Sequence, residues 1–81
     1  MKVVKVLGSG CANCKALAKQ TQIAADNCGV DVEIVKVEDF TEIAKWNVMA
    51  TPALVVDEEL KSSGRVLKAK EIEPFLQEEN D

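Results

Sequence analysis

The chain contains no histidine and no tyrosine, and aromatic residues make up only 4% of its 81 residues. The lack of histidine removes the usual general base and the commonest metal ligand. Positive charge is also limited, because 10 Lys and Arg stand against 14 Asp and Glu, which gives a net charge of −4. Phosphate binding needs clustered positive charge, and no basic stripe is visible. The balance therefore argues against a nucleic-acid binder.

Long hydrophobic runs are missing as well. The apolar run at the start stops at Gly8. It is too short for a secretory signal, and no later segment approaches the roughly 18 apolar residues of a membrane span. We therefore expect a cytoplasmic protein that does not enter membranes. With 47% hydrophobic residues, no repeat and no linker, residues 1–81 are expected to form one domain, and we expect it to be a monomer.

Cysteine is scarce, with three residues at Cys11, Cys14 and Cys28. An odd number does not suit a secreted disulfide scaffold, and a C-x-x-C pair in a reducing compartment indicates redox or metal chemistry. The pair alone could equally be half of a metal site. Cys28 lies about 21 Å farther along the predicted helix, at about 1.5 Å per residue, so it cannot complete such a site. We expect Cys28 to be a small, buried apolar residue.

Hydrophobic periodicity and turn signals predict seven elements. Strands are expected over residues 3–7, 30–37, 52–56 and 60–66, the last a weak edge strand interrupted at 62–64; residues 57–59 form a turn. Helices are expected over residues 11–28, 39–46 with Asp39 as cap, and around Ile72, Phe75 and Leu76. Pro74 fits that last helix only near its first turn. The order is βαβ-α-ββα, an α/β fold with a mixed four-stranded sheet and helices on both faces.

The cysteine pair lies where the first strand meets the first helix. Three-residue spacing at a helix start brings both side chains to one face, about 5–6 Å apart at Cβ, which is close enough to form a disulfide. Cys11 comes at the helix N-terminus, where unpaired N–H groups favour a thiolate and lower the thiol pKa. Cys14 is one turn inside the helix. We therefore expect Cys11 to be the nucleophile and Cys14 the resolving thiol.

Residues 49–52, Met-Ala-Thr-Pro, place a proline at the first residue of a strand. Together with the upstream C-x-x-C and the βαβ order, this segment resembles the thioredoxin superfamily, and more closely its small thioredoxin- or glutaredoxin-like members. The resemblance is carried by residues 8–15, residues 46–53 and Gly64. It implies a thioredoxin-like fold, with the Thr51–Pro52 bond cis and facing the cysteines.

Two departures from that pattern are informative. Thioredoxins usually carry Trp before the pair and Gly-Pro within it, whereas this chain has Gly10 before it and Ala12-Asn13 inside it. This dipeptide tunes the redox poise in the family, so the direction of electron flow is left open. The glutathione-binding features of glutaredoxins, a Gly-Gly-Asp and a Pro-Tyr, are absent from the sequence.

The resemblance implies an oxidoreductase that exchanges a Cys11–Cys14 dithiol or disulfide with protein disulfides. It also implies that Met49, Ala50, Thr51 and Pro52 contact the substrate, and that a reductase supplies electrons. No bound cofactor and no metal are required. A carboxylate could assist proton transfer from Cys14, but the sequence singles none out, and Glu38 and Asp39 are interpreted as loop and cap residues.

The alternative is a soft-metal module in which the two thiolates hold Cu(I). Copper-chaperone domains have a similar loop and size. Their order, however, is βαββαβ, and a methionine usually stands two residues before the first cysteine, where this chain has Ser9. The Thr51-Pro52 dipeptide would also be left unexplained. The redox function is therefore the preferred interpretation.

Overall fold

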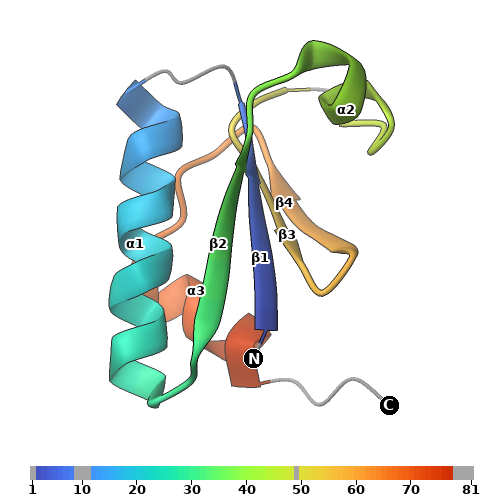
Figure 1. The fold of residues 1–81 in the computed structure, drawn as a ribbon. Coiled ribbons are helices and arrows are strands. Elements are labelled where there is room, and N and C mark those ends of the chain that lie inside the picture. Colours follow the sequence, from blue (N-terminus) through green and yellow to red (C-terminus); the bar gives the residue numbers. More distant parts are fainter. Residues whose placement is uncertain (1, 9–11, 49, 78–81) are drawn as a thin grey trace.

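The computed structural model describes residues 2–8, 12–48 and 50–77. The elements follow the predicted order: β1 (Lys2–Leu7), α1 (Ala12–Cys28), β2 (Val32–Val37), α2 (Phe40–Ala44), β3 (Ala53–Val56), β4 (Glu59–Ser63) and α3 (Ala69–Gln77). The four strands form one mixed sheet in the order β2-β1-β3-β4, with β1 parallel to β2 and the other pairs antiparallel. The predicted fold class is confirmed (Figure 1).

The two faces of the sheet are covered by different helices. Alternate residues of β1 and β3, such as Val6 and Leu54, join one apolar cluster with α1 and α3. The residues between them, such as Leu7 and Val55, join a second cluster with Ile43 of α2. The period-two alternation of side chains in strands accounts for this division. Figure 1 shows α1 and α3 together on one side and α2 near one end of the sheet.

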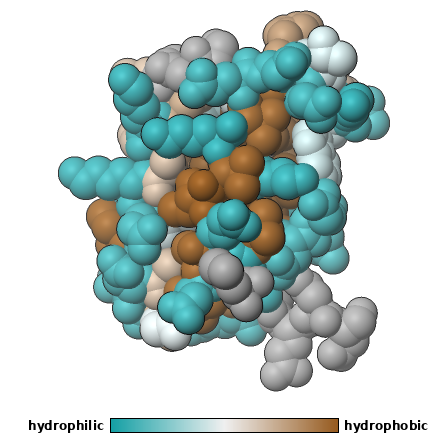
Figure 2. Space-filling model, viewed as in Figure 1, coloured by the Kyte–Doolittle hydropathy of each residue, from teal (hydrophilic) through white to brown (hydrophobic). Residues whose placement is uncertain are grey.

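Strand β2 forms one edge of the sheet. Its four apolar side chains are only half-buried, unlike those of β3, which are fully buried. Figure 2 shows the consequence, because a hydrophobic strip reaches the surface over β2 and is framed by hydrophilic side chains. None of the helices in the described ranges is long and apolar enough to cross a membrane.

Helix α2 is short and depends on its cap and its packing. The Asp39 carboxylate accepts a hydrogen bond of 2.8 Å from the backbone N–H of Thr41, which confirms the predicted N-cap. Ile43 anchors the helix in the second cluster, and Trp46 packs beside it as expected. The ammonium of Lys5 lies 5.2 Å from the centre of the Trp46 ring, within cation–π range. These contacts fix the segment that leads toward Thr51.

Two details of the C-terminal half differ from the prediction. Strand β4 begins at Glu59 and includes Ser62 and Ser63, because its backbone pairs with β3 at both serines whatever the side chains are. The register shifts once, where β4 passes from Val55 to Leu54 of β3. It ends before Gly64, whose φ is +78°. Pro74 is the sixth residue of α3 rather than part of its first turn. It removes one helical N–H, and the burial of Ile72 and Leu76 on the other side of the helix outweighs that loss.

Two leucines in neighbouring strands test the position of the core. Leu54 is fully buried in β3, whereas Leu60 of β4 is 41% exposed. We expect Leu54→Ala to lower the free energy of unfolding by about 2–5 kcal/mol, because it leaves a cavity under α1 and α3. The matched Leu60→Ala should cost less than about 1 kcal/mol. Urea unfolding followed by circular dichroism measures both, and equal losses would contradict the assigned core.

Candidate active site

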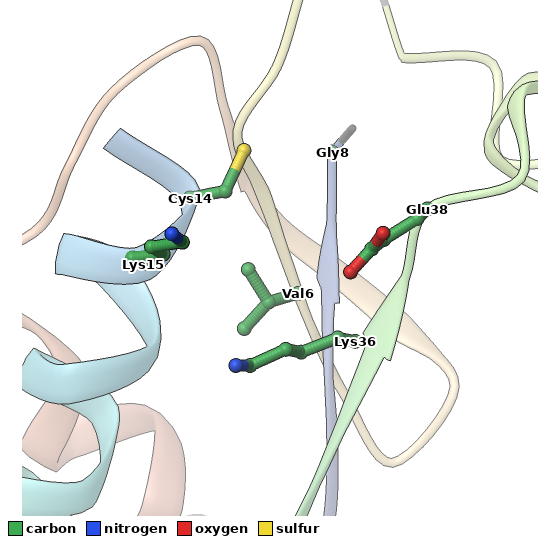
Figure 3. A pocket seen from close by; sticks show the side chains of 6 residues that line it. All are labelled: Val6, Gly8, Cys14, Lys15, Lys36 and Glu38. Atoms are coloured by element: carbon green, nitrogen blue, oxygen red, sulfur yellow. The ribbon is translucent and has the colours of Figure 1, made fainter. Parts of the chain in front are cut away.

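Cys14 lies where β1 ends beside the first turn of α1. Strand β1 stops at Leu7, and the backbone N–H of Gly8 then donates a 2.9 Å hydrogen bond to the carbonyl of Val37. This bond holds Gly8 at the end of β2. Cys14 is in the first turn of α1 and only 6% exposed. Figure 3 shows its sulfur directed toward the Gly8 end of β1.

Gly8 is required by space. Its backbone is not in the left-handed region, unlike that of Gly29 and Gly64. A Cβ built on Gly8 would overlap the Sγ of Cys14, and it would lie 3.4 Å from the Cβ of Cys14 and 3.8 Å from the Cβ of Thr51. The buried sulfur therefore occupies the volume that any side chain at position 8 would need.

The loop before β3 comes to the same place. The Thr51–Pro52 peptide bond is cis, and Pro52 is buried. The carbonyl of Pro52 accepts a 2.9 Å hydrogen bond from the N–H of Gly64, which ties the loop to the end of β4. Because the Cβ of Thr51 also borders the space at Gly8, Thr51 and Cys14 are brought together there.

The predicted site residues fall into three groups. Cys11 and Met49 lie outside the described residues. Cys14 and Pro52 are buried, and Ala50 and Thr51 are exposed. Ala50 and Thr51 line an open groove of about 500 Å³ that runs along α2, and Phe40, Ile43, Ala44, Asn47 and Val48 line the rest of it. The side chain of Phe40 is 82% exposed at its edge. Apolar surface of this kind marks a contact site more often than an isolated exposed residue does.

A second, smaller cavity adjoins Cys14 between α1 and β2. Its volume is about 30 Å³. The residues that line it include Lys15 of α1, Lys36 of β2 and Glu38, which directly follows β2 (Figure 3). This cluster was not predicted from the sequence, in which Glu38 is interpreted as a loop residue. The signal was present, because residues 34, 36 and 38 lie on one side of an extended chain and Ile34 packs toward α1.

Cys28 differs from its prediction. It is half-buried rather than buried, and its Sγ lies 3.9 Å from the carbonyl oxygen of Glu73 in α3. Residue 28 is the last of α1, where the helix leaves the cover of the core. It stands at the opposite end of α1 from Cys14. Within residues 2–8, 12–48 and 50–77, no three Cys, Asp or Glu side chains are grouped to hold a metal ion.

Known proteins of one family match this chain over nearly its whole length. Residues 2–77, from the start of β1 to the end of α3, match a family model described as "Thioredoxin domain". The chain is 38% identical over 76 residues to a thioredoxin of Methanothermobacter thermautotrophicus, covering 94% of this chain and 99% of that one. It is 36% identical over 76 residues to a thioredoxin of Methanocaldococcus jannaschii, covering 94% and 87%.

A double-mutant cycle tests the contact between Gly8 and Cys14. We expect Gly8→Ala to lower the free energy of unfolding by about 1–3 kcal/mol, because the new methyl group overlaps the buried sulfur. In a Cys14→Ala background the sulfur is absent, so the same change should cost less than half as much. Denaturant unfolding of the four variants gives the coupling energy. An equal penalty in both backgrounds would show that something other than the sulfur excludes a side chain from position 8.

Proposed function

Because this chain belongs to the thioredoxin domain family, it is a thiol–disulfide oxidoreductase, and we propose that Cys11 and Cys14 form its redox-active pair. The observation that supports this assignment most is the position of Cys14. Its sulfur is buried at the first turn of α1 and directed toward the Gly8 end of β1. Cys11 precedes this first turn in the sequence. No other cysteine among the described residues is near it, since Cys28 ends the same helix.

The two thiols then have different roles. The Cys11 thiolate attacks one sulfur of a disulfide, so that a mixed disulfide forms and the other substrate sulfur leaves as a thiolate. Cys14, being buried, cannot meet a large substrate directly and acts second. Its thiolate attacks Cys11 Sγ, the Cys11–Cys14 bond forms, and the remaining substrate sulfur leaves as a thiolate. Two electrons pass from the dithiol to the substrate, and the protons return to the two substrate thiolates.

The substrate is a protein disulfide held on the loop before β3. Thr51 and Ala50 are exposed, and the Cβ of Thr51 borders the space at Gly8. Both residues line the groove along α2. An extended segment of the partner can pair with the backbone at Thr51 while an apolar side chain enters the groove. Met49 and Pro52 complete this substrate-binding segment in the proposal.

A reductase restores the dithiol, and the reaction itself needs no bound cofactor. The cytoplasm is the location proposed, because it is the compartment that keeps such a pair reduced. The copper-binding alternative gains no support from the relatives, both of which are named thioredoxin.

Trapping tests the roles of the cysteines. We expect Cys14→Ser to accumulate a mixed disulfide with a model protein disulfide such as insulin, because the resolving attack is lost. Cys11→Ser should trap none, and Cys28→Ser should turn over as the unmodified protein does. Non-reducing electrophoresis and mass spectrometry identify the adduct and the cysteine that carries it. Mixed disulfides through Cys14 in the Cys11→Ser variant would reverse the roles.

A charge placed in the groove tests the substrate surface. We expect Ala50→Asp to raise the KM for insulin by about tenfold, since the carboxylate must lose water against an apolar partner side chain. The rate with a small dipyridyl disulfide should stay within about twofold, because this reagent does not fill the groove. Ala16→Asp, on an exposed position of α1 that lines neither cavity, is the matched control. An unchanged KM for insulin would place the contact surface elsewhere.

A further inference from the structure

Strand β2 forms an edge of the sheet that no other strand among the described residues covers. The carbonyls of Asp31 and Val37, near its two ends, accept hydrogen bonds of 3.0 and 2.9 Å from the β1 side. Successive residues of a strand turn their backbone groups to opposite sides, and the register with β1 is regular throughout. The N–H and C=O groups of Val32, Ile34 and Lys36 therefore point away from β1. Each of these residues offers one hydrogen-bond donor and one acceptor along the edge.

The opposite edge of the sheet is protected against further pairing, whereas β2 is not. The register of β4 with β3 shifts between Leu54 and Val55, and such a bulge bends an edge strand. Lys61 and Glu59 add a 2.9 Å ion pair on β4. Strand β2 has no proline and no bulge, and its apolar side chains form the strip that Figure 2 shows at the surface. A regular, apolar edge of this kind is a template for another strand.

We propose, in place of the monomer expected from the sequence, that β2 pairs with β2 of a second copy of this chain. A closed dimer of identical chains needs a two-fold axis. A strand repeated about an axis perpendicular to its sheet runs antiparallel to itself, as a strand pair of this kind requires. The axis passes through Ile34, and the two four-stranded sheets join into one.

The outward-facing residues of β2 select this register. Centred on Ile34, the pairing places Val32 of each copy opposite Lys36 of the other, so that every outward-facing residue meets a partner. On the other face of the sheet, Glu33 of each copy lies opposite Val35 of the other, so no like charges oppose each other. A register centred on any other residue of β2 either sets two Lys36 side chains opposite each other or places an outward-facing residue opposite a residue beyond the strand.

Helix α1 brings self-complementary charge to the same edge. Lys15 lines the cavity between α1 and β2 (Figure 3). Lys19, Gln22 and Asp26 follow it by four, seven and eleven residues, and so lie on the same side of the helix; all are exposed. This stripe is positive toward the start of α1 and negative toward its end. The two-fold axis reverses the second α1, so the basic half of each stripe lies beside the acidic half of the other, which favours a second copy as the occupant.

The proposed dimer leaves the substrate groove open. The groove runs along α2, and no residue of β2 is among those that line it. Cys14 lies at the end of the sheet where β1 and β2 finish, and the axis reverses the direction of β2 in the second copy. The two copies of Cys14 therefore lie at opposite ends of the joined sheet, where each can serve its own substrate.

Sedimentation equilibrium of the protein in a thiol reductant tests the dimer. We expect the mean mass to rise from one chain to two between about 10 µM and 1 mM protein, because an interface of one strand and one helix side is small. Ile34→Lys should weaken association by about tenfold or more, since two ammonium groups then meet at the axis. Leu60→Lys, at a 41% exposed position of β4, is the matched control and should leave association unchanged. Circular dichroism verifies the fold of each variant.

Charge reversal on α1 tests the orientation without touching the core. We expect Lys19→Asp alone and Asp26→Lys alone to weaken association at low salt by about fivefold or more, because each change affects both copies of the contact. The double variant restores opposite charges and should recover the dimer. A double variant as weak as the single ones, with its fold intact, would overturn the antiparallel arrangement.

Amide hydrogen exchange followed by NMR locates the interface. The N–H of Ile34 should gain protection as the protein concentration rises, whereas that of Val35, which faces β1, should be protected at every concentration. A protein that remains a single chain at about 1 mM would overturn the proposal and leave the edge to another extended segment. A dimer that the reductant abolishes would also overturn it, as would one that persists unchanged in Ile34→Lys.

Discussion

The thiol of Cys14 lies against the backbone of Gly8, in the space where any other residue would carry its side chain. This contact brings together the end of β1, the first turn of α1 and, much later in the sequence, the loop before β3. Gly8 is held to β2 through its bond to Val37, Cys14 belongs to the first turn of α1, and Thr51 borders the same point from the loop before β3. Such a buried sulfur, held against the backbone, suits the resolving role proposed for Cys14, because the attack on a neighbouring sulfur depends on alignment.

The two faces of the sheet support different parts of this arrangement. The apolar cluster between the sheet and helices α1 and α3 packs α1 against the strands, and this packing positions Cys14. The cluster under α2 fixes the other side, where Leu7 and Ile43 pack together and the groove that ends at Thr51 begins. Cys14 and the proposed substrate groove therefore lie at the same end of the sheet and are supported by separate halves of the core.

The order of the elements could be predicted from the sequence because the strands are rich in β-branched residues and the helices have clear period and cap signals. Asp39 and the glycine after Cys28 are local signals of this kind. The strand boundaries at Ser62 and Ser63 could not, since backbone pairing with β3 overrides side-chain preference there. The contact between Cys14 and Gly8, and the position of Glu38 at the cavity beside Cys14, depend on how α1 packs against β2. The sequence holds the alternation that places Lys36 and Glu38 on one side, but not the packing that brings that side to Cys14.

The identity of the redox pair is tested most directly by mapping the oxidised protein. We propose equilibrating the chain with thiol–disulfide buffers of known ratio, quenching by alkylation, and locating each disulfide by peptide mass spectrometry. A single reversible two-electron couple between Cys11 and Cys14, with Cys28 alkylated at every ratio, is the expected result. A disulfide that includes Cys28, or a Cys14 that stays reduced while Cys11 pairs with the buffer thiol, would contradict the assignment.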